Sequence, residues 1–244
     1  RDPFSHLGPH RDAADGWVVR AFLPGATAVR ALAADGGAVL AHLTDAEGLG
    51  LFAGHVGGLD RPHYRLAVEF GDRRFELEDP YRFGPWLGEM DVWLLAEGSH
   101  LRPFERLGAH LRVVDGVPGT AFAVWAPDAQ RVSVIGDFNT WDGRRHPMRL
   151  RRECGVWEIF IPGVGEGACY KFEIRSREGQ LLPHKADPYG FAAELRPSTA
   201  SVVHALTPRN VPPRIAPGSR LDRPVSIYEV HLGSWRRRSG GGFL

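Results

Sequence analysis

The chain has 244 residues, of which 43% are hydrophobic and 24% charged, and its 30 basic and 29 acidic side chains leave a net charge of +1. This apolar content with both signs of charge excludes a disordered or low-complexity chain. The near-neutral balance argues against a nucleic-acid partner, which requires a basic stripe, and no run of about 18 apolar residues is present to cross a membrane.

Cysteine and histidine usage favours a cytoplasmic protein without a bound metal. Only Cys154 and Cys169 are present, with no C-x-x-C pair, which is typical of a reducing compartment. The sequence opens at Arg1 without a charged-then-apolar leader, so we expect no secretory signal. The 11 histidines include no H-E-x-x-H motif and no Cys/His cluster, although His6 and His10 have helical spacing. We therefore expect no metal and no cofactor.

Five sequence features occur twice in the same order, about 100 residues apart, which predicts a tandem duplication. They are an F-x-x-L-G-x-H opening (4–10 and 104–110), a strand-like run that ends in Pro (17–24 and 120–127), a second apolar run (28–32 and 131–135), an aromatic-basic-apolar triplet (64–66 and 170–172) and a D-P-Y-x-F closing motif (79–83 and 187–191).

Both copies have the pattern of an all-β fold. In the second copy, short apolar runs with partial alternation are separated by Asn, Asp, Gly and Pro clusters, as in a small antiparallel sandwich. These runs are 121–126, 131–138, 148–151, 156–161, 169–175 and 201–204. The glycine-rich segment 162–167 lies between two of them and is interpreted as a hairpin loop, because no helix and no Lys-Ser/Thr follow it as in a phosphate loop. If Ile161 pairs near Cys169, the two cysteines lie roughly 20 Å apart, so we expect two free thiols.

The composition changes at Pro208, where five prolines fall within residues 208–224 and predict a stiff linker. Residues 225–232 then have the pattern of one more strand. A single strand cannot fold alone, so we expect it to open a larger domain that the sequence does not contain.

Two groups of motifs resemble a known family. The run 134–142 (VIGDFNTWD), followed by GVWE at 155–158 and YKF at 170–172, is similar to the glycogen-binding sandwich module of starch- and glycogen-active enzymes. The paired Leu-Gly-x-His openings, with YEVHLGSWR at 228–236, resemble the N-terminal region of bacterial 1,4-α-glucan branching enzymes.

The resemblance implies two tandem immunoglobulin-like antiparallel β-sandwiches, followed by the first strand of a truncated (β/α)8 barrel of the α-amylase type. The expected domains are a degenerate N-terminal sandwich (1–99), a glycogen-binding sandwich of the carbohydrate-binding module 48 type (100–207), a Pro-rich linker (208–224) and the start of the catalytic barrel (225–244). The partners implied are α-glucans such as glycogen and amylose, and the missing barrel of the same chain.

The family reaction is a retaining transfer, in which an Asp nucleophile and a Glu acid move an α-1,4-glucan chain to a 6-hydroxyl. The resemblance places both catalytic carboxylates beyond Leu244, so we expect the 244-residue fragment to be inactive. Two alternatives stay open. One is a debranching or maltooligosyl-trehalose hydrolase-type relative, and the other is a non-enzymatic glycogen-targeting protein.

The resemblance implies glucan contacts by Trp141 and Lys171. Trp141 lies in an Asn-Thr-Trp-Asp loop, where an indole can stack on a glucose ring while polar groups such as Asn139 take the hydroxyls. Another aromatic of the family site falls where this chain has Leu181. The matching loop of the first copy, 33–37, has no aromatic residue and predicts a spacer or docking domain.

Other conspicuous side chains are interpreted as structural. Trp125 and Trp157 alternate with polar or small residues and are expected in the core. Asp187 opens a Pro-Tyr turn that Asp79 repeats, which indicates local turn chemistry. Asp137 and Asp142 bracket a tight loop, and none of these carboxylates is assigned to catalysis.

Overall fold

The computed structural model describes residues 2–12, 16–58, 60–206, 227 and 229–230. It separates the chain into two units, residues 1–207 and 208–244. The linker expected at 208–224 lies outside the described residues, as does most of the strand expected at 225–232. Within the described part, no helix is both long and apolar enough to cross a membrane.

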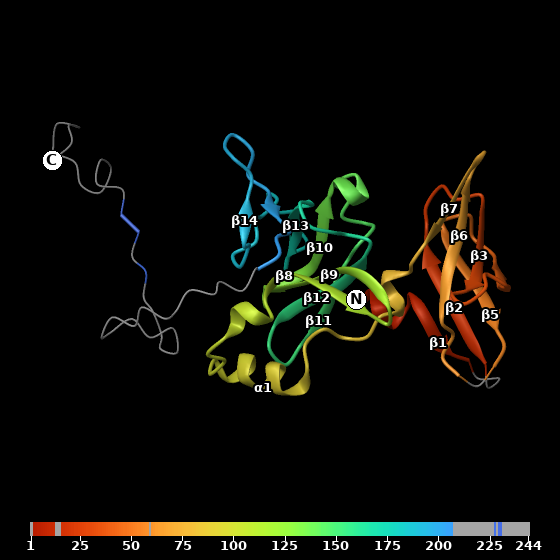
Figure 1. Cartoon of the computed structure of the whole chain (residues 1–244), viewed down its shortest axis with the longest axis horizontal. Helices are drawn as coiled ribbons and strands as arrows, with labels where there is room; N and C mark the ends of the chain where they lie inside the picture. The colour runs from red at the N-terminus through yellow and green to blue at the C-terminus, as the bar shows by residue number, and fades with distance from the viewer. Residues whose placement is uncertain (1, 13–15, 59, 207–226, 228, 231–244) are drawn as a thin grey trace. The chain divides into compact units, whose positions relative to one another are not determined.

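The first half of unit 1–207 forms two antiparallel sheets, which we call the N-terminal sandwich (Figure 1). Their strand orders are β1-β2-β5 and β4-β3-β6-β7. The strands are β1 (Gly8–Arg11), β2 (Trp17–Phe22), β3 (Ala28–Ala33), β4 (Val39–Leu43), β5 (Leu51–Val56), β6 (Tyr64–Phe70) and β7 (Arg73–Leu77). Alternate residues of both sheets, such as Val19, Phe52 and Leu66, point inward and share one buried core, as the period of two in a strand requires.

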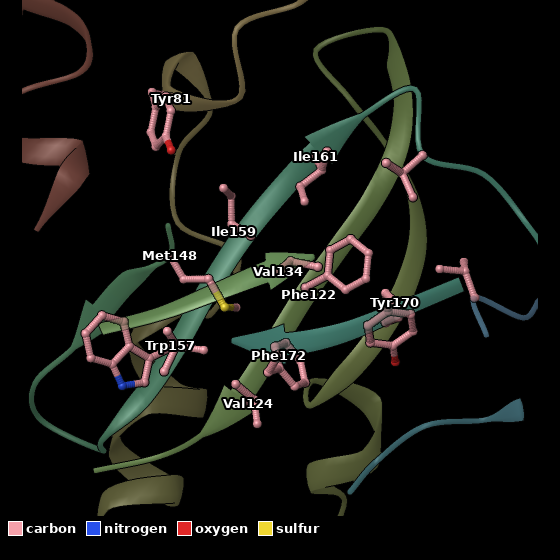
Figure 2. Close-up of a cluster of buried hydrophobic side chains, with 14 residues drawn as sticks. Tyr81, Phe122, Val124, Val134, Met148, Trp157, Ile159, Ile161, Tyr170 and Phe172 are labelled. Atoms are coloured by element: carbon pink, nitrogen blue, oxygen red, sulfur yellow. The ribbon is translucent and has the colours of Figure 1, made fainter. Parts of the chain in front are cut away.

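The second half forms the C-terminal sandwich, with strand orders β11-β12-β9-β8 and β10-β13-β15-β14. The strands are β8 (Gly108–Val114), β9 (Val117–Trp125), β10 (Ala129–Gly136), β11 (Arg149–Arg151), β12 (Val156–Pro162), β13 (Cys169–Ser176), β14 (Ala192–Ala193) and β15 (Ser201–Val202). Figure 2 shows its core, in which Phe122, Trp157 and Phe172 gather between the two sheets.

The segment between the sandwiches contains the only α-helix of the described residues, which the sequence analysis did not predict. Helix α1 (Glu89–Glu97) ends at Gly98, whose φ of 75° suits the left-handed C-terminal cap. Its Val92 packs with Leu87 and Leu107 over the outer face of β9 and β12. The helix is therefore held by tertiary packing, as is usual for a helix of nine residues.

The closing motif of the first copy joins the two sandwiches. The described residues contain four short 3-10 turns: η1 (Pro3–Ser5), η2 (Pro80–Arg82), η3 (Pro103–Glu105) and η4 (Asp137–Asn139). Tyr81 of η2 is buried in the core of the C-terminal sandwich (Figure 2). Phe83 packs edge-on against Phe160 with ring centroids 4.7 Å apart, and the guanidinium carbon of Arg149 lies 3.8 Å from the Phe4 ring centroid.

The duplication extends to side-chain hydrogen bonds. In the first copy the Tyr64 hydroxyl donates to Asp79 Oδ2 at 2.6 Å, and in the second the Tyr170 hydroxyl donates to Asp187 Oδ2 at 2.7 Å. The other oxygen of each carboxylate accepts the backbone amide two residues further along the chain. The turn role predicted for both aspartates is confirmed.

The glycine of each Leu-Gly-x-His opening packs against the closing motif of its own copy. Gly8 has a φ of 84° and Gly108 a φ of 103°, in the region that favours glycine. A Cβ atom on Gly8 would collide with the carbonyl oxygen of Tyr81, and one on Gly108 would lie 2.9 Å from that of Tyr189. The two motifs recur together because each pair forms one close contact.

The hairpin expected around segment 162–167 is wrong. Segment 162–167 is not a hairpin loop, because β12 pairs with β9 and β11 while β13 pairs with β10 and β15. The segment instead crosses from one sheet of the sandwich to the other. Cys154 and Cys169 are both free, which confirms the expected thiols, although the strand pairing assumed for that expectation does not exist.

The expected core positions of the two tryptophans have different outcomes. Trp157 is 3% exposed and confirmed as core, whereas Trp125 is 61% exposed and the core interpretation is wrong. Along β9 the inward positions belong to Phe122 and Val124, so Trp125 falls on the outer face at the end of the strand.

Candidate functional site

The loop after β10 carries Trp141 and is built around a buried asparagine. Asn139 Oδ1 accepts the Gly136 amide at 2.9 Å, and its Nδ2 donates to the Val134 carbonyl at 2.9 Å and to His146 Nδ1 at 2.8 Å. Asn139 is only 1% exposed. Its amide is thus used within the loop, so the structure gives it a positioning role where we expected a sugar contact.

His146 supports this arrangement as a neutral ring. Burial lowers the pKa of His146 to about 4, so that the ring is uncharged near neutral pH. A neutral imidazole can accept the Asn139 hydrogen bond at Nδ1. The loop is therefore held by a network of hydrogen bonds that is satisfied without a ligand.

The backbone of the loop is strained at Thr140 and Trp141. Thr140 and Trp141 have φ values of 57° and 58°, and the Trp141 amide donates to the Gly136 carbonyl at 2.9 Å. A left-handed conformation is unfavourable for a bulky residue. Such strain is found disproportionately at functional sites, where the surrounding structure enforces it.

The Trp141 indole is partly exposed, and its polar edge is already fixed. Its Nε1 donates to Asp137 Oδ1 at 2.8 Å. Asp142 in the same loop forms an ion pair with Arg144, at 2.8 Å between Nη2 and Oδ2, and the hydrogen bonds from Arg144 lower the pKa of Asp142 to about 2. The loop therefore holds an aromatic side chain in a set orientation beside a compensated pair of charges.

Lys171 lies on β13, next to the strand that leads into this loop. It is directly opposite Ile135 of β10, two residues before the loop begins. Its neighbours Tyr170 and Phe172 are fully buried in the core, so Lys171 points to the outer face, as expected. Its Nζ donates to the Thr199 hydroxyl at 2.7 Å, a contact between residues 28 positions apart that no local pattern predicts.

Leu181 lies beside β13 on the side away from β10. It forms an isolated bridge with Arg175 of β13 and is 53% exposed. Arg175 is four positions along β13 from Lys171, which corresponds to about 13 Å along the strand. The structure thus brings the Trp141 loop, Lys171 and Leu181 to one sheet, with the last at a distance from the other two.

No group of three or more His, Cys, Asp and Glu side chains in the part of the chain that the structure describes could hold a metal ion. The buried carboxylates serve structural contacts: Glu158 accepts the amides of Trp86 and Leu87 at 3.0 and 2.7 Å.

Two family models match the chain, one for each sandwich. Residues 1–81 match the N-terminal domain of alpha-1,4-glucan branching enzyme GlgB, and residues 106–190 match carbohydrate-binding module 48, the isoamylase N-terminal domain. The chain carries the N-terminal region of the GlgB family.

Curated GlgB relatives match across nearly all of the chain. The 1,4-alpha-glucan branching enzyme of Paramagnetospirillum magneticum is 58% identical over 97% of the chain and 32% of its own length. That of Rhodopseudomonas palustris is 56% identical over 100% of the chain and 33% of its own length. The chain therefore spans about one third of the GlgB relatives that it matches.

Among solved structures, a pullulanase from Anoxybacillus sp. LM18-11 complexed with maltotetraose is 17% identical to the chain. The alignment covers 88% of the chain and 28% of the pullulanase, with a TM-score of 0.35.

Proposed function

We propose that the chain is the glucan-binding N-terminal region of a 1,4-α-glucan branching enzyme. Such an enzyme cleaves an α-1,4-glucan and transfers the released chain to a 6-hydroxyl, forming the branches of glycogen. The order of the two matched domains supports this proposal, as does the high identity to GlgB proteins. We place the catalytic carboxylates outside residues 1–244, so this region contributes binding and docking.

The proposal includes the finer architecture. We assign residues 1–99 and 100–207 to two immunoglobulin-like sandwiches, residues 208–224 to a linker, and residues 225–244 to the start of an α-amylase-type barrel. The partners are α-glucans and the catalytic barrel of the same enzyme. A cytoplasmic location fits a chain with two free thiols and a glycogen substrate.

The strained, hydrogen-bonded loop that presents Trp141 carries the binding assignment. An indole fixed at its polar edge can stack on the apolar face of a glucose ring without a further loss of side-chain freedom. Lys171 lies beside the loop and can donate to sugar hydroxyls. Asn139 contributes by holding the loop rather than by touching the ligand.

Affinity electrophoresis in glycogen-containing gels tests this assignment. We expect glycogen to retard the wild-type chain and Trp141→Ala to weaken binding by roughly tenfold, the loss of one good aromatic contact. Trp93→Ala is the matched control, because this tryptophan is 54% exposed on α1, away from the loop. Equal mobility with and without glycogen for the wild type would contradict the proposal.

A further inference from the structure

A cleft of about 560 Å³ lies between the two sandwiches, inside the compact unit of residues 1–207. One wall comes from the end of β2 and from β6 and β7, and the opposite wall from residues 138–146 and 161–164. Residues 78–81, which connect the two sandwiches, also line it. The volume falls within the range of about 300–1,000 Å³ that small-molecule sites occupy.

The charged side chains that line this cleft already have partners. Glu76 forms an ion pair with Arg65 at 3.2 Å, and Glu78 forms one with Arg82 at 2.7 Å. Asp142 is paired with Arg144 at 2.8 Å and with Arg145 at 4.0 Å. Asp79 accepts a hydrogen bond from the Tyr64 hydroxyl at 2.6 Å. His146 is neutral because burial lowers its pKa to about 4. Because these side chains already have partners, the lining favours a neutral ligand over an ion.

Aromatic side chains from both sandwiches complete the lining. Phe22 at the end of β2 is 38% exposed, Phe70 ends β6, and Phe138 belongs to the loop that carries Trp141. Aromatic surface beside paired polar groups suits a ligand with apolar faces and hydroxyl edges. A short chain of pyranose rings has that chemistry.

We propose that this cleft is a second glucan subsite, in which Phe22 of the N-terminal sandwich contacts a chain that also passes Trp141. The inference rests on the proposed function. The loop supports it, because Phe138, Asn139 and Asp142 line the cleft and Trp141, which is outside the lining, is their neighbour in the chain. The first copy, which has no aromatic in its own loop, would thus serve as one wall of a shared binding site.

Binding of fluorescently labelled maltoheptaose by the 1–244 chain, measured by anisotropy, tests the subsite. We expect Phe22→Ala to raise the dissociation constant roughly threefold to tenfold. Phe104→Ala is the matched control, because this phenylalanine is 42% exposed and lies outside the cleft lining. Displacement of the sugar by millimolar inorganic phosphate would overturn the assignment to a neutral ligand.

Hydrogen exchange with and without maltoheptaose keeps the test independent of the variants. Slower exchange in peptides covering 20–24 and 160–164 supports the subsite. Protection at 137–142 without protection of those peptides would overturn it and leave the Trp141 assignment standing. No protection in any peptide, with no binding by the wild type, would overturn the proposed function itself.

Discussion

Replacing Tyr64 by Phe isolates one hydrogen bond to a buried carboxylate. The Tyr64 hydroxyl is 2.6 Å from Asp79 Oδ2, and Tyr64 and Asp79 are 0% and 2% exposed. Phenylalanine keeps the ring that packs in the N-terminal core and removes only the donor. Water cannot readily replace the lost hydroxyl at such a site, so the carboxylate oxygen loses a partner.

The size of the effect depends on pH. Burial raises the pKa of Asp79 from 3.8 to about 6, and the Tyr64 hydrogen bond opposes that rise. Because the pKa of Asp79 is higher in the folded than in the unfolded protein, its protonated form stabilises the fold. This stabilisation, about 3 kcal/mol, is fully present below pH 3.8 and is lost as the pH rises through about 6. Without Tyr64 the pKa rises further, so the variant loses more stability at high pH.

We therefore expect Tyr64→Phe to lower the free energy of unfolding by about 2–3 kcal/mol at pH 7.5, where Asp79 is ionised, and by about 1 kcal/mol at pH 4.5, where it is protonated. Urea unfolding followed by tryptophan fluorescence measures both, with Trp17 in the same core as reporter. In an Asp79→Asn background, Tyr64→Phe should cost the same at both pH values. An equal loss at both pH values in the Asp79 protein would refute the reasoning.

Three further predictions concern packing and reactivity. Gly8→Ala should lower the free energy of unfolding by about 2–4 kcal/mol, because Gly8 has a left-handed φ and a Cβ atom there would collide with the Tyr81 carbonyl. Gly36→Ala should lower it by only about 1 kcal/mol, because Gly36 has a φ of 86° but nothing lies within 4 Å of its Cβ position. Similar losses in the two variants would contradict the close contact at Gly8. Glu158→Ala should cost about 3–5 kcal/mol and speed hydrogen exchange at the two amides that it binds, and unchanged exchange would count against this role. A thiol reagent should modify two cysteines per unfolded chain. In the folded chain it should modify the half-buried Cys169 before the buried Cys154. The reverse order would show that the burial is misassigned.

Part of the candidate site was accessible from the sequence because short local patterns carry it. The Asn-Thr-Trp-Asp loop identified Trp141, and alternation on one strand put Lys171 on the face opposite Tyr170 and Phe172. The role of Asn139 was not accessible, because an asparagine can bind a sugar or hold a turn. Only the positions of the Val134 carbonyl and the His146 ring show that it holds this loop.

The sequence by itself determined the duplicated all-β organisation, because strand alternation and turn chemistry depend on neighbours a few residues apart. The repeated closing aspartates are an example, since each binds the amide two residues along. Tertiary structure alone decided that β12 and β13 lie in different sheets, that Trp125 is exposed, and that Phe22 and Phe138 line one cleft. Those outcomes depend on which strands pair and which faces meet, and such contacts join residues distant in the chain whose local patterns are compatible with several partners.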